Sequence, residues 1–393
     1  MNAWQPIAPV LEADSDGLSA PFTVQRPPGD APAAPLVFAT PHSGRVYPAR
    51  MMAASQLDAS AIRRSEDAFV DRLIERAPAH GATVISAALA RAFLDVNREP
   101  WELDPAMFAD ELPDYARGRT ARIAAGLGSI ARVVCEGQEI YARKLSFAEA
   151  RGRIETVHRP YHVALAELIA ETRAAHGVAV LIDWHSMPSA AAVPAAGGRR
   201  CDLVLGDRYG GACSPVLSRL VERELEAMGY AVARNAPYAG GYTTEHYGRP
   251  GRGVHVLQIE VNRALYLDEA TLALTAGFAP LKADLERLFA ALAEMDWRRV
   301  ERRAQKKGRA FQMKRARPVI REETPMKGRC VRDASWAEIR VRRTIDQEKM
   351  FAFAAKKCCL ARYCSKINTH DGRPIFVQRT TPGGGVALEG PIA

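Results

Sequence analysis

The segment Val178–Ser189 (VAVLIDWHSMPS) constrains the fold more than any other part of the chain. Its apolar run is bounded by Gly177 and Pro188, a pattern typical of a buried strand in a parallel sheet. Ligand-binding groups of open α/β sheets lie just beyond the carboxyl ends of the strands. His185 stands at that position, and Asp183, two residues earlier, shares its strand face. We therefore expect this strand end to belong to a functional site.

Two further segments repeat this pattern. His42 follows an apolar run that begins at Leu36, and Glu260 lies inside the apolar segment 254–263. A single His beside a strand is more often structural, but two at separate strand ends favour a shared role. A Glu inside an apolar strand is costly to bury without a partner, which argues against an ordinary surface position. The three strand ends predict one site that contains two histidines and a carboxylate.

Alternating strand and helix signals predict an α/β sheet domain. A longer segment, 237–251, is rich in Gly, Tyr and Pro, and loops of that size are usually binding loops or lids. We expect strands at 36–39, 82–87, 91–96, 178–185, 202–205, 230–234 and 254–260, and helices at 55–77, 147–175, 214–228 and 279–295.

Length and composition limit the class of protein. A chain of 393 residues can hold one large α/β domain and an appendage. No apolar run approaches the roughly 18 residues of a membrane span, and the N-terminus lacks the pattern of a signal peptide. Seven scattered cysteines, an odd number, favour reduced thiols over a disulfide framework. These features predict a soluble, cytoplasmic protein that does not bind membranes.

The net charge of +9 is unevenly distributed. Residues 298–393 contain 24 Lys and Arg against 9 Asp and Glu, whereas residues 1–297 contain 30 against 36. We therefore expect a loose lead-in over residues 1–34, a mildly acidic catalytic domain over 35–297, and a basic, poorly ordered extension over 298–393.

The basic extension has two other possible interpretations. The run 298–317 predicts a solvated helix that continues the last helix of the domain, and the charge allows contact with nucleic acid. Cys358, Cys359, Cys364 and His370 do not have a standard structural-zinc spacing. A metal knuckle is therefore the weaker interpretation.

The predicted site has the residue types of a zinc hydrolase. Such a site needs His and carboxylate ligands, an open position for water and a carboxylate base nearby. His42 and His185 supply two nitrogen ligands, and Asp67 or Glu66 can supply the third. Glu260 is the natural base.

Asp183 is placed to hold the second nitrogen of the His185 ring. The chain contains no Gly-x-Ser-x-Gly elbow, His-Glu-x-x-His helix, phosphate-binding loop or dinucleotide fingerprint. Ser43 and Ser186 each follow a His directly in sequence, which is an awkward geometry for proton transfer. These absences leave metal-dependent hydrolysis as the favoured chemistry.

Several ordered motifs resemble the N-formylglutamate amidohydrolase family over residues 35–295. They are Pro41–Gly44, Glu66-Asp67, Asp95–Arg98, Pro160–His162, Asp183–Ser186, Gly240–Gly248 and Val254–Asn262. The resemblance implies a three-layer α/β/α fold with a central mixed, mostly parallel sheet, related to zinc carboxypeptidases and to the aspartoacylase and succinylglutamate desuccinylase group. It implies hydrolysis of N-formyl-L-glutamate to formate and L-glutamate, at an amide C–N bond, in histidine degradation.

The resemblance also implies roles for individual residues. It assigns the ligands of one zinc ion per chain to His42, Asp67 and His185, and the general base to Glu260. It assigns Asn97 and Arg98 to the substrate, and a guanidinium suits a carboxylate.

Further residues are candidates for substrate contacts. Tyr242 and His246 could polarise the carbonyl or close over the substrate. Arg263 and Arg249 are candidates for binding a carboxylate of the substrate, but each could equally be a structural ion-pair partner.

Two departures from related sequences leave alternatives open. Arg45 stands where the related carboxypeptidases place a Glu ligand, so the third ligand must come from elsewhere. Glu245 stands where some family members carry an Arg, so a different N-acyl amino acid is an alternative substrate. A second alternative is a nucleic-acid-associated protein that binds through the basic extension.

Overall fold

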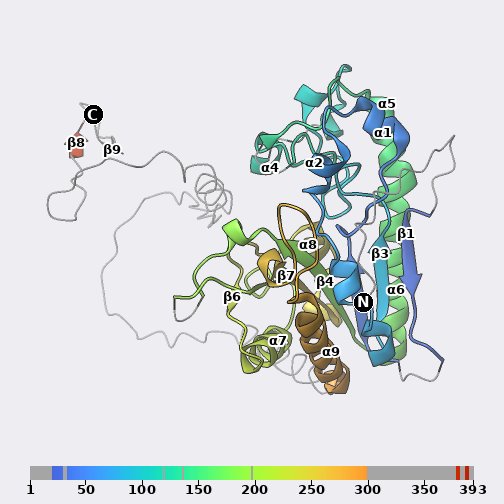
Figure 1. Ribbon diagram of the computed structural model, residues 1–393, viewed down its shortest axis with the longest axis vertical. Coiled ribbons are helices and arrows are strands. Elements are labelled where there is room, and N and C mark those ends of the chain that lie inside the picture. The colour runs from blue at the N-terminus through green and yellow to red at the C-terminus, as the bar shows by residue number, and fades with distance from the viewer. Residues whose placement is uncertain are drawn as a thin grey trace, which may run out of the picture. The chain divides into compact units, whose positions relative to one another are not determined.

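A seven-stranded mixed sheet organises the main part of the chain (Figure 1). The computed structural model describes residues 20–29, 33–116, 118, 120–134, 137–195, 198–298, 378–380 and 386–388. The strands are β1 (Phe22–Gln25), β2 (Leu36–Thr40), β3 (Thr83–Ala87), β4 (Ala179–Met187), β5 (Leu203–Gly206), β6 (Val232–Arg234) and β7 (Val254–Asn262). Their order is β1-β3-β2-β4-β7-β5-β6. Only β1 with β3 and β5 with β7 pair antiparallel within this sheet, so it is mixed and mostly parallel, as predicted.

Helices cover both faces of the sheet. They are α1 (Ala49–Ala54), α2 (Ala59–Arg63), α3 (Val70–Leu73), α4 (Ala121–Ala124), α5 (Phe147–Arg153), α6 (Arg159–His176), α7 (Pro215–Ala227), α8 (Tyr242–Tyr247) and α9 (Phe278–Glu294). Helices α3, α7 and α9 pack on one face, and α6 packs on the other, where α1, α2 and α5 belong to the same apolar cluster. Figure 1 shows α6 on the opposite side of the sheet from α7 and α9. The side chains of β2 alternate between the two faces, so Phe38 faces the first set of helices and Val37 faces the second. The three-layer prediction is confirmed.

Shorter helical turns connect these elements. The 3₁₀ turns are η1 (Ala77–His80), η2 (Pro105–Met107), η3 (Asp114–Ala116), η6 (Ser189–Ala191), η7 (Pro250–Arg252) and η8 (Arg263–Leu265). A π-helical turn, η5 (Ile154–His158), joins α5 to α6.

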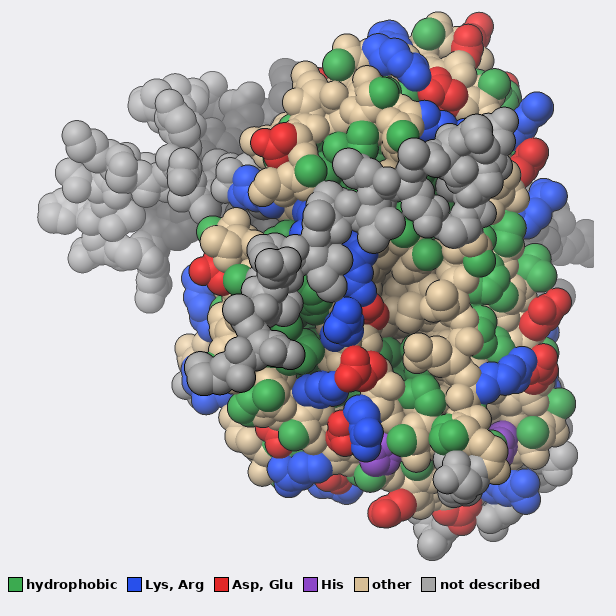
Figure 2. All heavy atoms as spheres, turned by 45° about the vertical axis from the view of Figure 1, so that its right-hand side comes forward, with side chains coloured by type: hydrophobic (Ala, Val, Ile, Leu, Met, Phe, Trp, Pro, Cys, Tyr) green, Lys and Arg blue, Asp and Glu red, His purple; other side chains and the backbone are tan. Residues whose placement is uncertain are grey.

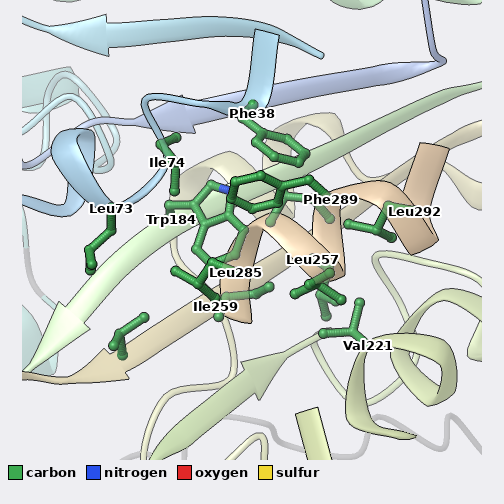
Figure 3. Close-up of a cluster of buried hydrophobic side chains, with 14 of the residues drawn as sticks. Phe38, Leu73, Ile74, Trp184, Val221, Leu257, Ile259, Leu285, Phe289 and Leu292 are labelled. Atoms are coloured by element: carbon green, nitrogen blue, oxygen red, sulfur yellow. The ribbon is translucent and has the colours of Figure 1, made fainter. Parts of the chain in front are cut away.

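Aromatic packing fixes the direction in which β4 presents its polar residues. Trp184 is fully buried against Phe38 and Phe289, with each of their ring centroids 5.7 Å from that of Trp184 (Figure 3). Because side chains alternate along a strand, Asp183 and His185 must leave β4 on the opposite face, toward α6. The core on the α9 side therefore sets the orientation of the polar strand end.

Most predicted elements are present, but several predictions need correction. The helix predicted over 55–77 is broken into α2, α3 and η1, because Phe69 has a left-handed backbone conformation (φ 62°). The strand predicted over 91–96 is a series of turns, in which the amides of Phe93 and Leu94 both donate to the carbonyl of Ala90. Its apolar side chains are buried, which explains the misleading pattern.

The other two corrections concern the lead-in and the long loop. Residues 22–25 of the predicted loose lead-in form β1, an edge strand too exposed to show an apolar run. The predicted loop 237–251 contains α8 and η7.

Little of the basic extension lies within the described residues. Strands β8 (Gln378–Thr380) and β9 (Val386–Leu388) form a separate antiparallel pair. Helix α9 ends at Glu294, since Met295 is extended (ψ 129°), so it does not continue into Arg298 as predicted. The predictions for the basic run, for the Cys358–His370 segment and for contact with nucleic acid fall outside the described residues.

The surface of the main domain carries mixed charge. On the face drawn in Figure 2, Lys and Arg side chains lie among Asp and Glu side chains. This agrees with the nearly balanced composition of residues 1–297. Among the described helices, none is long and apolar enough to cross a membrane.

Candidate metal centre

Three ligand atoms from distant parts of the chain converge at one end of the sheet. Nδ1 of His185 lies 3.1 Å from Nδ1 of His42 and 3.0 Å from Oδ2 of Asp67. Nδ1 of His42 lies 3.3 Å from Oδ2 of Asp67, so the three atoms form a triangle. In a tetrahedral zinc site, ligand atoms about 2.0–2.1 Å from the metal lie about 3.3 Å apart. The side chains are only 2–4% exposed. The spacing and the donor types therefore suit a zinc ion.

The local backbone explains why His42 and Asp67 meet. The chain turns after β2, and the backbone N–H of Asp67 donates to the carbonyl of His42 (3.0 Å). Gly44 permits this turn to approach the following segment, since a Cβ there would lie 2.2 Å from the carbonyl oxygen of Leu89. The break between α2 and α3 thus delivers Asp67 to the end of β2.

Two further carboxylates fix the orientation of the imidazole rings. Nε2 of His42 lies 2.6 Å from Oδ1 of Asp95, and Nε2 of His185 lies 3.1 Å from Oδ2 of Asp183. An ionised carboxylate only accepts hydrogen bonds, so each Nε2 carries a hydrogen, which leaves the lone pair of each Nδ1 to bind a proton or a metal ion at the centre. Two such lone pairs 3.1 Å apart repel each other unless a cation lies between them.

The charges around the centre also favour a cation. Burial raises the pKa of Asp67, but hydrogen bonds from His185 and His42 outweigh it and hold that pKa well below its usual value. Burial lowers the pKa of His185, but Asp183 and Asp67 outweigh it and raise that pKa well above its usual value. The field that favours a proton on His185 would equally favour a metal ion between the ligand atoms.

Glu66 and Asp67 have different surroundings. Glu66 accepts hydrogen bonds from the hydroxyl of Tyr47 (2.8 Å) and from Nε of Arg63 (3.0 Å). Within the described part of the chain, Asp67 has an oxygen close enough to His42 and His185 to share a metal ion with them, and Glu66 does not. Glu66 instead contributes to a buried polar network.

Two arginines hold the other oxygen of Asp67. Nη2 of Arg263 lies 3.0 Å from Oδ1 of Asp67, and Nη1 of Arg91 lies 3.7 Å from the same atom. Arg263 also donates to the hydroxyl of Ser186 (3.0 Å). The contacts of Arg263 are thus those of a structural ion pair, the alternative left open by the sequence.

Glu260 lies beside the three ligand atoms without joining them. It is the register partner of His185 on the neighbouring strand β7 and shares its face of the sheet. Its carboxylate accepts a hydrogen bond from Gln258 (2.7 Å). Burial raises its pKa, an effect that the nearby His185 opposes. A buried carboxylate with a raised pKa is suited to take up and release a proton.

The loop 95–98 brings Asn97 and Arg98 to the same end of the sheet. Asn97 donates to Asp183 (3.1 Å), and its side-chain oxygen accepts from the backbone N–H of Thr243 in α8 (2.8 Å). Nε of Arg98 is buried 3.9 Å from Oδ2 of Asp95 and has no hydrogen-bond partner among the described residues. Arg98 therefore has a donor available for a ligand.

Helix α8 contributes the aromatic candidates. The rings of Tyr242 and His246 are stacked, with centroids 4.9 Å apart. Arg249 donates to the carbonyls of Glu245 (2.8 Å) and Gly248 (2.6 Å), which is a structural role. The Glu245 side chain pairs with Arg208 at 3.1 Å.

Sequence reasoning gave no role to several residues of this centre. Asp95 and Arg91 belong to the segment predicted as a strand, yet Asp95 orients His42 and Arg91 pairs with Asp95 at 2.7 Å. The Asp-x-Asn-Arg motif pointed to this segment but not to a contact with His42. Arg45 forms an ion pair with Asp71.

The chain is similar to known proteins in sequence and in structure. The model of the N-formylglutamate amidohydrolase family matches residues 34–267. The N-formylglutamate deformylase of Pseudomonas aeruginosa is 32% identical over 240 residues, 60% of this chain and 83% of that protein. The Pseudomonas putida enzyme of the same name is 30% identical over 239 residues, 60% of this chain and 82% of that protein.

A solved structure is also similar to this chain. The crystal structure of N-formylglutamate amidohydrolase from Ralstonia eutropha JMP134 aligns with a TM-score of 0.63 at 39% identity. The alignment covers 70% of this chain and 98% of that chain. The matched segment includes β2, β4 and β7 and the residues of the candidate centre. The chain belongs to the N-formylglutamate amidohydrolase family.

Proposed function

We propose that this protein is a zinc-dependent amidohydrolase that converts N-formyl-L-glutamate and water to formate and L-glutamate. The observation that carries the proposal is the triangle formed by His42, Asp67 and His185, with Glu260 beside it in register with His185. The names of the relatives support the substrate. Metal dependence rests on the ligand geometry alone.

The residues of the centre divide the chemistry between them. His42, Asp67 and His185 would hold the zinc ion, which when bound lowers the pKa of water and polarises a carbonyl. Glu260 takes the proton from the attacking water and delivers it to the nitrogen of the leaving glutamate. Burial raises the pKa of Glu260, which makes that carboxylate a stronger base than an exposed one.

Arg98 is the proposed receptor for a substrate carboxylate. Its buried Nε lacks a hydrogen-bond partner among the described residues, and a guanidinium binds a carboxylate through two parallel hydrogen bonds. Burial lowers the pKa of Arg98, and the nearby charge of Arg122 adds to that effect. A dicarboxylic substrate would relieve the repulsion between two guanidinium groups, and Asn97, held by Asp183 and Thr243, would line the same position.

The other candidates take different places in this proposal. Tyr242 and His246 on α8 would cover the substrate, since the main chain of α8 is tied to Asn97. We assign Arg263 to the support of Asp67 and not to the substrate, because its guanidinium donates to Ser186 and Asp67.

The proposal is tested by metal analysis combined with a substrate screen. Purified protein should contain about one zinc per chain and release formate from N-formyl-L-glutamate, and chelation should abolish the release. N-acetyl-L-glutamate and N-succinyl-L-glutamate test the acyl group, and N-formyl-L-leucine tests the second carboxylate. Full activity after complete removal of metal would refute the metal-dependent mechanism.

A further inference from the structure

A π-helical turn lies between α5 and α6, at residues 154–158. Such turns are rare and frequently occur at functional sites. Here the turn ends at His158, and His162 follows one helical turn later on the same face of α6. Their ring centroids are 4.3 Å apart. The two histidines therefore form one unit on the helix that faces the loop 95–98.

Both histidines bond the main chain of that loop. Nε2 of His158 lies 3.0 Å from the carbonyl oxygen of Arg98, and Nε2 of His162 lies 2.7 Å from the carbonyl oxygen of Val96. A carbonyl oxygen only accepts, so each Nε2 must carry a hydrogen. Burial lowers the pKa of both rings, that of His162 to about 3, and both are therefore neutral near pH 7.

The loop uses its alternate residues for the metal centre. While the carbonyls of Val96 and Arg98 bind the histidines, the side chain of Asp95 orients His42 and that of Asn97 bonds Asp183. The carbonyls of the loop thus contact η5 and α6, and its side chains contact the candidate metal centre. Movement of the loop away from α6 would displace Asp95, the partner of His42, and Asn97, which bonds the partner of His185.

His162 also joins this loop to α8. Its Nε2 carries the hydrogen, so its Nδ1 accepts from the hydroxyl of Tyr247 at 2.9 Å, and the two rings stack with centroids 5.8 Å apart. The opposite end of α8 bonds Asn97 through the N–H of Thr243. His162 therefore contacts both elements that meet at Asn97.

We propose that His162, supported by His158, is a positioning residue that holds the loop 95–98 against the metal ligands and thereby sets the zinc affinity of the centre. The proposal rests on the proposed function only in requiring a metal at His42, Asp67 and His185. Partners of metal ligands typically change metal affinity or activity by about 10–100-fold when removed. His162 acts one contact further out, so about tenfold is expected.

The test compares two amides of different reach. In His162→Gln the side-chain amide extends to the position of Nε2 and can donate to Val96, whereas in His162→Asn it is too short. His176→Gln, on the same helix and away from the loop 95–98, is the control. Zinc dissociation constants come from competition with a chromophoric chelator, with thermal unfolding measured in parallel. We expect His162→Asn to weaken zinc binding about tenfold, His162→Gln to restore most of it, and the control to match wild type.

The outcomes separate the two proposals. Equal zinc affinity of wild type, His162→Asn and His162→Gln would overturn the role of His162 and leave the proposed function intact. Absence of zinc binding by wild type would overturn both. If His162→Asn fails to fold, His158→Gln and His158→Asn provide the same comparison at the carbonyl of Arg98. Equal affinity of that pair to wild type would also overturn the proposal.

Discussion

His185 and Glu260 are register partners on the adjacent parallel strands β4 and β7. Their side chains therefore leave the same face of the sheet, at the end where ligands bind in α/β proteins. The Trp184 side chain, packed against two phenylalanines on the other face, prevents β4 from shifting by one residue. The core thus keeps the proposed metal ligand His185 and the proposed base Glu260 at a fixed separation.

Replacement of Glu260 tests the base directly. Glu260→Gln preserves shape and the contact with Gln258 but removes the basic oxygen, so kcat should fall by about 10²–10⁴-fold. Zinc content should stay at wild-type level, because Glu260 is not among the three candidate ligand residues. Steady-state formate release and metal analysis measure both quantities. Glu294→Gln, an exposed position on α9, is the control, and wild-type turnover in Glu260→Gln would remove Glu260 from the mechanism.

The pair Glu66 and Asp67 provides a matched test of the third ligand. Asp67→Ala should lose bound zinc and activity together, since it removes one corner of the ligand triangle. Glu66→Gln should keep its zinc and lower stability by about 1–3 kcal/mol, because the buried Glu66 partners Tyr47 and Arg63. Zinc content after gel filtration and urea unfolding measure these effects. Retention of zinc in Asp67→Ala together with its loss in Glu66→Gln would reverse the assignment.

Strand ends were the predictable part of this site. Apolar runs located β2, β4 and β7, and their polar ends placed His42, His185 and Glu260 at one edge of the sheet. That inference needs only the alternation of strands and the parallel arrangement of neighbours. The choice of Asp67 over Glu66 came from the family resemblance, because both residues lie on the same turn.

The connecting segments were not predictable from periodicity. Residues 55–77 keep helical spacing of apolar residues through the turn at Phe69, although the backbone there is left-handed. The segment 91–96 buries its apolar side chains without pairing as a strand. The role of Asp95 depends on where that turn meets His42, which is a contact between residues 53 positions apart. Local sequence carries no signal for such a contact.

Arg98 should decide the preference for an acidic substrate. Arg98→Met keeps the length of the side chain and removes its charge, so KM for N-formyl-L-glutamate should rise at least tenfold. The same change should affect N-formyl-L-leucine less if Arg98 binds the carboxylate of the glutamate side chain, and equally if it binds the α-carboxylate. Zinc content should not change. An unaltered KM for both substrates would show that Arg98 does not contact the substrate.

The contact between Arg143 and Glu149 predicts a pH-dependent contribution to stability. Glu149 caps α5 through the N–H of Ser146 and pairs with Arg143 at 2.9 Å, and the hydrogen bond from Arg143 lowers the pKa of Glu149 from 4.5 to about 2. A carboxyl whose pKa is lower in the folded state stabilises the fold above its unfolded pKa, and this contribution is lost as the pH falls.

Glu149→Gln should therefore reduce stability at pH 7 by only about 0.5–1 kcal/mol, because solvent screens this exposed pair. The difference from wild type should shrink between pH 4.5 and pH 2, as wild-type Glu149 becomes protonated. Urea unfolding midpoints at pH 7, 5, 4 and 3 measure the trend. Glu155→Gln, which removes a more distant, exposed pair with Arg151, is the control. A difference between Glu149→Gln and wild type that stays constant down to pH 3 would show that the Glu149 charge does not support the helix start.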